Sequence, residues 1–188
     1  MTWLSLSLLL IHFAEPPRTL VVHVVNTSNV PRDVVAWAGK EVQRIYQKAG
    51  IPIVWSLDPA VNETNGFQVT VVITARCINR QICRDKSVMG TALGSDRDGI
   101  PRAYVFSDHV YEMAVKFHKR APVPRPEALV LGHAIAHEVG HLLLPPPGHT
   151  NSGLMAPRMD LPAIRDAVRG DLLFTREQSE HMRGTLSR

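Results

Sequence analysis

The stretch between residues 129 and 149 constrains what this chain can fold into more than any other part of its sequence. It contains His137, Glu138 and His141 in the pattern H-E-x-x-H. On a helix, His137 and His141 stand one turn apart on the same face, so both imidazoles can reach a single metal ion. Glu138 projects beside them, where its carboxylate can accept a proton from water. The pattern therefore predicts a metal-dependent hydrolase.

The predicted helix around this motif is apolar on nearly every side, which is typical of a buried helix. Placing a glutamate and two histidines in such surroundings costs several kcal/mol, by order of magnitude, unless something pairs with them. A bound dication is the simplest compensation, because it is the largest local charge in such a site. His133 lies one turn before His137. We interpret His133 as a packed histidine. The alternative is that it contacts the metal ligands without binding the metal itself.

A third ligand is predicted after the end of this helix. Pro145-Pro146-Pro147 cannot continue a helix, so the helix must stop before them. Gly148 then frees the backbone to turn, and His149 can return toward the metal. Three protein ligands that leave one position open form the arrangement that catalytic zinc needs. Glu177 and Glu180, on a later predicted helix, are alternative third ligands.

Length and composition fit one globular domain, with 188 residues of which 45% are hydrophobic and 20% charged. The net charge of +4 comes from scattered Lys and Arg without a nucleic-acid-binding motif, so no nucleic-acid partner is predicted. Residues 1–14 form an apolar run too short to span a bilayer, and we interpret them as a secretory signal. Residues 15–188 would then be a single secreted or periplasmic domain. We expect a monomer without a transmembrane span.

Two further groups of residues have open interpretations. The spacing of Cys77 and Cys83 allows a disulfide that closes a small loop, which an oxidising compartment would favour, and a pair of free thiols is the alternative. Asp96 and Asp98 lie in a predicted turn where two carboxylates could bind calcium. Two carboxylates are weak evidence for such a site, so we favour a solvated turn.

Strand and helix patterns that alternate along the chain predict an α/β layer. The predicted strands cover Thr19–Val25, Ile51–Trp55, Phe67–Thr74, Ser87–Leu93 and Arg102–Phe106. The predicted helices run from Pro31 to Ala49, from Ser107 or Asp108 to about Lys119, from about Pro126 to Leu144, from Asp160 to Arg169, and from Thr175 to before Gly184. The first strand, helix and strand imply a parallel crossover. Asp160 is predicted to cap one helix, and Thr175 with Gln178 to form a capping box for the last.

The segment from His137 to His149, followed by Gly153-Leu154-Met155-Ala156-Pro157, resembles the active site of metzincin zinc peptidases, especially the matrixin type. The likeness covers most of residues 19–157 in element order and looks closest to small secreted bacterial members of that group. In the usual pattern, H-E-x-x-H-x-x-G-x-x-H, the third histidine comes six residues after the second. Here Leu144 stands at the glycine position and the third histidine comes two residues later.

The resemblance implies a metzincin-like fold of the α/β (α+β) class. A twisted mixed β-sheet would pack on helices that include the zinc-binding helix in residues 15–149, and a small helical C-terminal part, residues 150–188, would lie below the cleft. The resemblance also assigns roles to individual residues. One zinc ion would be bound by His137, His141 and His149, with Glu138 as general base and Met155 in the methionine turn beneath the metal.

The strand that includes Met89, Gly90, Thr91 and Ala92 would pair with the backbone of a peptide or protein substrate in such a fold. Thr91 stands where matrixins often have a histidine for a structural zinc, so we expect one zinc ion only. The resulting prediction is a zinc-dependent endopeptidase. One alternative is a metal-dependent hydrolase of non-peptide amides. Another is a non-catalytic, zinc-stabilised protein that binds peptides or a cell-envelope partner. Glu138 argues against this alternative, because a purely structural zinc site has no need of a general base.

Overall fold

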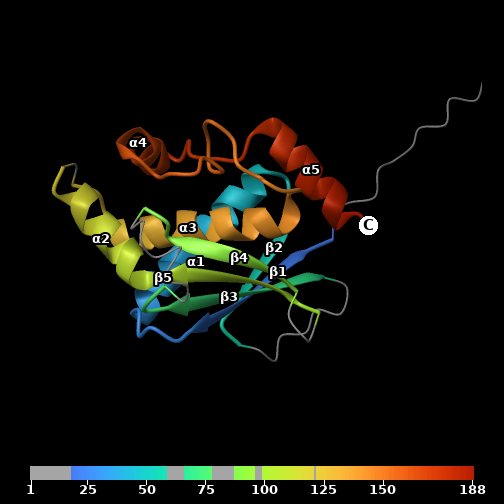
Figure 1. The fold of residues 1–188 in the computed structure, drawn as a ribbon, viewed down its shortest axis with the longest axis horizontal. Helices are drawn as coiled ribbons and strands as arrows, with labels where there is room; N and C mark the ends of the chain where they lie inside the picture. Colours follow the sequence, from blue (N-terminus) through green and yellow to red (C-terminus); the bar gives the residue numbers. More distant parts are fainter. Residues whose placement is uncertain (1–17, 59–65, 78–86, 96–98, 121) are drawn as a thin grey trace, which may run out of the picture.

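The computed structural model describes residues 18–58, 66–77, 87–95, 99–120 and 122–188 (Figure 1). The strands are β1 (Leu20–Asn26), β2 (Ile53–Ser56), β3 (Phe67–Thr74), β4 (Gly90–Ser95) and β5 (Pro101–Phe106). The helices are α1 (Arg32–Lys48), α2 (Ser107–His118), α3 (Pro126–Leu143), α4 (Leu161–Arg169) and α5 (Arg176–Leu186). The predicted signal segment, Cys83, Asp96 and Asp98 lie outside the described residues. Cys77 takes part in a disulfide bond.

The strands form one mixed sheet in the order β2-β1-β3-β5-β4. Neighbouring strands are parallel except for β4, which runs antiparallel to β5 at one edge. The predicted crossover is present, because β1 and β2 are parallel neighbours, with Leu20 opposite Ile53, and α1 connects them. The predicted α/β fold with a mixed sheet packed on helices is therefore confirmed.

Helices α1 and α3 lie side by side between the sheet and the C-terminal helices α4 and α5 (Figure 1). Alternate residues along each strand face these helices, as the period of a strand requires. They include Leu20, Val22 and Val24 of β1, Val69, Val71 and Ile73 of β3, and Ala103 and Val105 of β5. Gly132 lets the two helices approach closely, because a Cβ added there would lie 2.9 Å from the carbonyl oxygen of Ala38.

The C-terminal part begins as the local sequence predicts. The Asp160 side chain accepts a hydrogen bond from the backbone of Ala163, and Gly170 ends α4 in a left-handed conformation. Thr175 and Gln178 form the predicted capping box of α5. Among the helices of the described residues, none is long and apolar enough to cross a membrane.

Predicted boundaries differ from the structure by two or three residues in four places. The strand predicted from Ile51 begins at Ile53, and the strand predicted to end at Leu93 continues to Ser95.

The two larger differences have a physical cause. The predicted strand at Ser87 begins only at Gly90, because pairing with β5 starts where Gly90 lies opposite Val105. The last helix continues through Gly184 to Leu186 instead of ending before the glycine. Leu186 is buried in the core, and this burial outweighs the cost of about 1 kcal/mol for a glycine inside a helix.

Candidate metal centre

Helix α3 carries three of the predicted site residues, and neighbouring helices bond to its middle and to its C-terminal end. It begins with Pro126 in its first turn and ends at Leu143, directly before the three prolines. Tyr46 of α1 is fully buried and donates a hydrogen bond of 3.1 Å to the carbonyl oxygen of Ala136. The hydroxyl of Thr185 in α5 donates to the carbonyl oxygen of Leu143 at 3.1 Å, which satisfies a carbonyl left free at the helix end.

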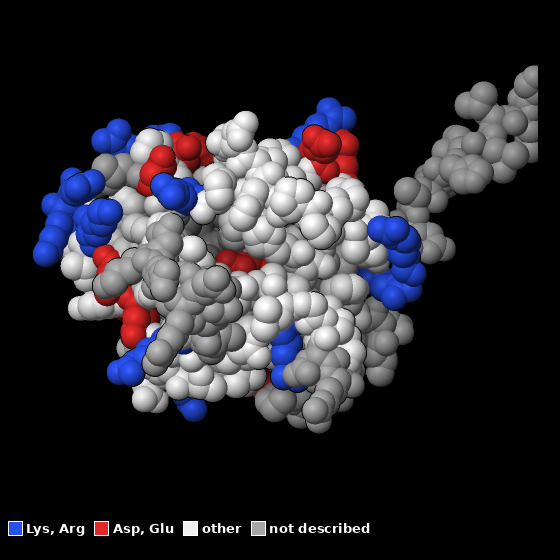
Figure 2. Space-filling view, viewed as in Figure 1, with Lys and Arg blue, Asp and Glu red and all other residues white. Residues whose placement is uncertain are grey.

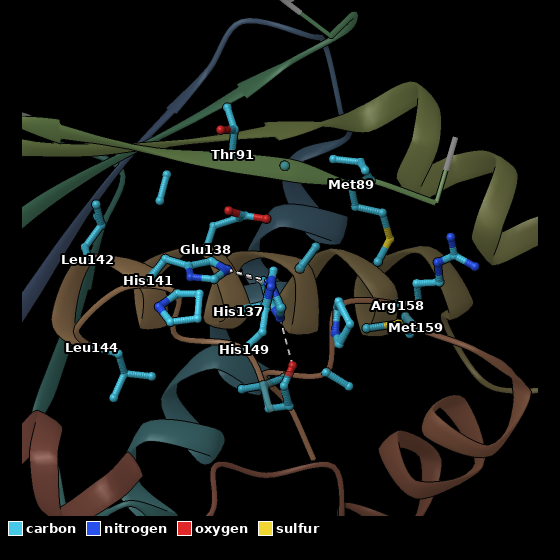
Figure 3. A pocket seen from close by; sticks show the side chains of 18 of the residues that line it. Met89, Thr91, His137, Glu138, His141, Leu142, Leu144, His149, Arg158 and Met159 are labelled. Atoms are coloured by element: carbon cyan, nitrogen blue, oxygen red, sulfur yellow. Dashed lines mark hydrogen bonds between the residues drawn. The ribbon is translucent and has the colours of Figure 1, made fainter. Parts of the chain in front are cut away.

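The three predicted histidine ligands meet at one point (Figure 3). Nε2 of His141 lies 3.1 Å from Nε2 of His137 and 3.1 Å from Nε2 of His149. A proton on one nitrogen can join only two of these rings, whereas a cation can accept a lone pair from all three. Nitrogens bound at about 2.0–2.1 Å to a tetrahedral zinc ion stand about 3.3 Å apart. The histidines therefore lie close enough together to hold a metal ion.

The protonation of these rings suits metal ligands. Nδ1 of His137 lies 2.8 Å from the carbonyl oxygen of Leu154, and this acceptor requires an N–H on that nitrogen. Nε2 of the neutral ring then keeps its lone pair for the metal. Burial lowers the pKa of His137, and burial together with the two neighbouring imidazoles lowers the pKa of His141 to about 4. Both rings are therefore neutral near pH 7, as metal binding requires.

His149 is presented by a loop rather than by a helix. Gly148, immediately before it, has a φ of 71°, a left-handed conformation that residues with a side chain rarely adopt. A Cβ added at Gly148 would lie 2.8 Å from Nδ1 of His141. The glycine therefore provides both the turn and the space that the loop needs to pass His141. The bend predicted at Pro147-Gly148 is thus where the chain turns.

The turn after the third histidine is closed by one hydrogen bond and tied to α5 by another. The backbone N–H of Thr150 donates to the carbonyl oxygen of Met155 at 3.0 Å, and Gln178 of α5 donates to the Thr150 hydroxyl at 3.1 Å. Met155 is fully buried. A Cβ added at Gly140 of α3 would lie 2.8 Å from Sδ of Met155. The predicted turn methionine therefore packs directly against the motif helix.

Glu138 lines a cleft of about 610 Å³ together with the three histidines. Figure 3 shows Glu138 between the histidines and Thr91 of β4, and in Figure 2 acidic atoms are visible at the bottom of the hollow in this face. Glu138 is the only acidic residue among the described residues that line the cleft. Burial raises its pKa to about 8, because a residue that is 7% exposed loses the hydration of its charged form.

The edge strand β4 forms one wall of the cleft. Three residues of the predicted substrate strand, Gly90, Thr91 and Ala92, open β4, and Met89 comes directly before it. All four line the cleft. Among the strands of the described residues, β4 lies at the edge of the sheet and pairs only with β5. Backbone N–H and C=O groups on its other side can therefore bond to an extended peptide.

Other predicted candidates lie away from the histidine cluster. Glu177 and Glu180 are exposed on α5, and His149 is the third member of the cluster instead. His133 is fully buried, with Nε2 3.5 Å from a carboxylate oxygen of Glu41. Of the two interpretations of His133, the structure therefore supports the packed histidine.

Sequence reasoning missed several groups that shape this centre. The carbonyl oxygen of Leu154 and the hydroxyl of Tyr46 left no recognisable signal, because every residue has a carbonyl and many buried tyrosines bond to one. The close approaches at Gly90 and Gly140 did leave a signal. Gly90 lies inside the predicted strand and Gly140 inside the predicted helix, where glycine destabilises the element by roughly 0.5–1 kcal/mol, which indicates a close approach of another group. Gly90 is predicted as part of the substrate strand, whereas its contact with Glu138 is not.

Comparison of the chain with known protein families and with curated proteins returns no match.

Proposed function

We propose that this protein is a zinc-dependent endopeptidase in which Glu138 is the general base. The observation that carries the proposal is the cluster of three histidines, with His141 3.1 Å from each of the other two, in a cleft with one carboxylate and an open strand edge. A structural zinc site normally closes with four protein ligands. Among the described residues, no fourth His, Cys, Asp or Glu joins this cluster, which favours an open, catalytic site.

Zinc is the metal that best fits this set of donors. Calcium and magnesium take oxygen ligands, whereas neutral imidazole nitrogens suit zinc and other transition metals. Three histidines with one open position are a known arrangement for catalytic zinc. When bound, a zinc ion would supply Lewis acidity, which makes water more acidic and polarises a carbonyl oxygen.

Glu138 would move the proton during hydrolysis. Its carboxylate must be ionised to take a proton from the attacking water, and a nearby dication favours that form over the neutral form that burial favours. As the C–N bond breaks, Glu138 delivers the proton to the leaving nitrogen, which restores the carboxylate. The proton count therefore balances over one cycle without another acid.

An extended peptide is the substrate that fits this cleft. The free side of β4 can add a peptide strand through backbone hydrogen bonds. Apart from Glu138, Arg158 and the histidines, the described residues that line the cleft are uncharged. We therefore expect neutral, apolar residues on either side of the peptide bond that is cut.

The test compares zinc-loaded wild-type protein with E138Q on a mixed library of quenched fluorescent peptides. The wild-type protein should cleave, and E138Q should lose about 10²–10⁴-fold in kcat, the usual contribution of a general base. Zinc affinity should not change, because Glu138 is not a ligand in this proposal. E177Q makes the same substitution at an exposed glutamate of α5 and should keep wild-type turnover.

Two outcomes would contradict the proposal. Equal cleavage by the wild-type protein and E138Q would remove Glu138 from the role of base. Absence of cleavage by wild-type protein that binds one zinc ion would favour the alternative, a protein that binds peptides or an envelope partner without cutting them.

A further inference from the structure

Gly90, the first residue of β4, lies directly against the side chain of Glu138. A Cβ added at Gly90 would lie 2.6 Å from Cγ of Glu138 and 2.8 Å from its Cδ, and also 2.6 Å from the carbonyl oxygen of Tyr104. Approaches under 3.0 Å essentially never occur for real Cβ atoms. Any larger residue at position 90 must therefore move the carboxylate, the strand or both.

Packing alone orients the Glu138 side chain. Within the described part of the chain, its carboxylate makes no hydrogen bond or ion pair. A glutamate has several staggered rotamers, and in the absence of polar partners its neighbours decide which of them is occupied. The backbone at Gly90 is such a neighbour, because it comes close to Cγ and Cδ, the atoms that determine where the carboxylate points.

We propose that Gly90 is a positioning residue for Glu138, and that the missing side chain at position 90 sets where the carboxylate stands relative to the histidines. The inference rests on the proposed function, in which Glu138 is the general base. It gives Gly90 a task beyond pairing with a substrate strand. A side chain at this position would displace the base even if β4 still bound the peptide through its free edge.

The contact can be measured without a catalytic assay, in the full-length chain, by combining G90A with E138A. G90A should lower Tm by roughly 2–12 °C, the range expected for overpacking in a domain of this size. E138A removes Cγ and Cδ of the glutamate. In the E138A background, G90A should therefore lower Tm by less than about half of the loss that it causes in the wild-type protein. The remaining loss would come from the carbonyl of Tyr104.

G94A is the matched control for stability, because Gly94 lies on the same strand and a Cβ added there meets nothing within 4 Å. Its effect on Tm should be small and equal in the wild-type and E138A backgrounds. A purely general sensitivity of β4 to added methyl groups would instead make G94A behave like G90A, which would overturn the proposal.

The kinetic readout separates positioning from substrate binding. G90A should lower kcat by about 10–100-fold, the effect of a displacement of about 1 Å at a catalytic group. It should change KM by less than about 3-fold and leave zinc affinity unchanged, because the histidines keep their places. G184A, on α5, adds a Cβ that also meets nothing within 4 Å and should keep the wild-type kcat.

Other results would overturn the inference. Equal Tm losses from G90A with and without the Glu138 side chain would place the clash at Tyr104 alone, and a wild-type kcat in G90A would mean that the base had not moved. If G90A does not fold, folding of the G90A/E138A double variant supports the inference, and failure of both contradicts it. If the wild-type protein cleaves no peptide, the proposed function fails, while the Tm measurements still decide whether Gly90 positions Glu138.

Discussion

The candidate metal centre holds the same kind of ligand in two different ways. His137 and His141 are half-buried on α3, a helix of 18 residues, and their spacing follows from the helix itself. His149 is exposed and stands on a loop that depends on the left-handed backbone of Gly148 and on hydrogen bonds of Thr150. The helix pair is ordered by local backbone bonds, whereas the loop is ordered by contacts with distant parts of the chain.

This difference shows where a metal site of this kind is vulnerable. Ligands on a buried helix lose little additional freedom when a metal binds, because burial has already fixed their backbone. A loop ligand loses more, unless other contacts hold the loop in advance. Changes in the loop should therefore act on metal affinity through preorganisation, and changes in the helix should act through the ligands themselves.

The largest effect is expected from removing a helix ligand. H141A should weaken zinc binding by more than about 100-fold, because a direct ligand contributes more than the outer partners whose loss costs about 10–100-fold. H149A should weaken binding less than H141A, because a ligand on an exposed loop loses more freedom when the metal binds and so contributes less net affinity. Competition with a fluorescent zinc chelator measures both. H118A changes an exposed histidine of α2 and should have no effect.

Equal zinc affinities of H141A and H149A would show that the helix and loop ligands are equivalent, and would contradict the distinction drawn between them. An affinity of H149A equal to that of H118A would remove His149 from the ligand set.

A smaller effect is expected from G148A, which changes the loop without removing a ligand. Alanine must adopt the left-handed conformation there, and its Cβ would press on Nδ1 of His141. Zinc affinity should fall by about 10–100-fold, as for other groups that orient ligands. G99A is matched, because Gly99 has a φ of 77° but open space around its Cβ position. It should cost about 1 kcal/mol of stability from backbone strain and leave zinc affinity unchanged; the same loss of affinity in both variants would contradict the argument.

A still smaller effect is expected from deleting a single hydroxyl on each side of the comparison. T150V removes the acceptor for Gln178 in the loop, and T185V removes the donor to Leu143 at the end of α3. Each should lower the free energy of unfolding by about 0.5–1.5 kcal/mol in urea titrations. T150V should also reduce zinc affinity a few-fold because the loop is less ordered, whereas T185V should not. A reduction of zinc affinity in both variants would show that the helix ligands are held no more firmly than the loop ligand.

H133L should leave zinc affinity at pH 7.5 unchanged, but it should change how the stability of the protein depends on pH. Burial lowers the pKa of His133, against the opposing effects of the Leu129 carbonyl and the Glu41 carboxylate. The folded state therefore binds fewer protons than the unfolded state, and stability is lost as pH falls below about 6.5. H133L should reduce this slope by up to about 1.4 kcal/mol per pH unit, measured by urea unfolding of zinc-free protein. H118L, at an exposed histidine, should leave the slope as it is, and an unchanged slope in H133L would refute the assignment.

Local patterns predicted much of the fold. The bounds of α1 and α3 followed from proline at the start, proline or glycine after the end, and apolar periodicity, and the caps of α4 and α5 followed from Asp160 and Thr175. Errors occurred where distant contacts decide. The start of β4 depends on its register with β5, and the end of α5 depends on the burial of Leu186.

In the candidate site, too, local sequence determines some features and distant contacts determine others. The positions of His137, Glu138 and His141 relative to one another could be read from the motif, because the geometry of a helix depends only on residues a few positions apart. The motif could not show how His149 reaches the cluster, which carbonyl orients His137, or that Gly90 comes against Glu138. These features depend on how a loop, an edge strand and a helix pack together, and packing joins residues that are far apart in the chain.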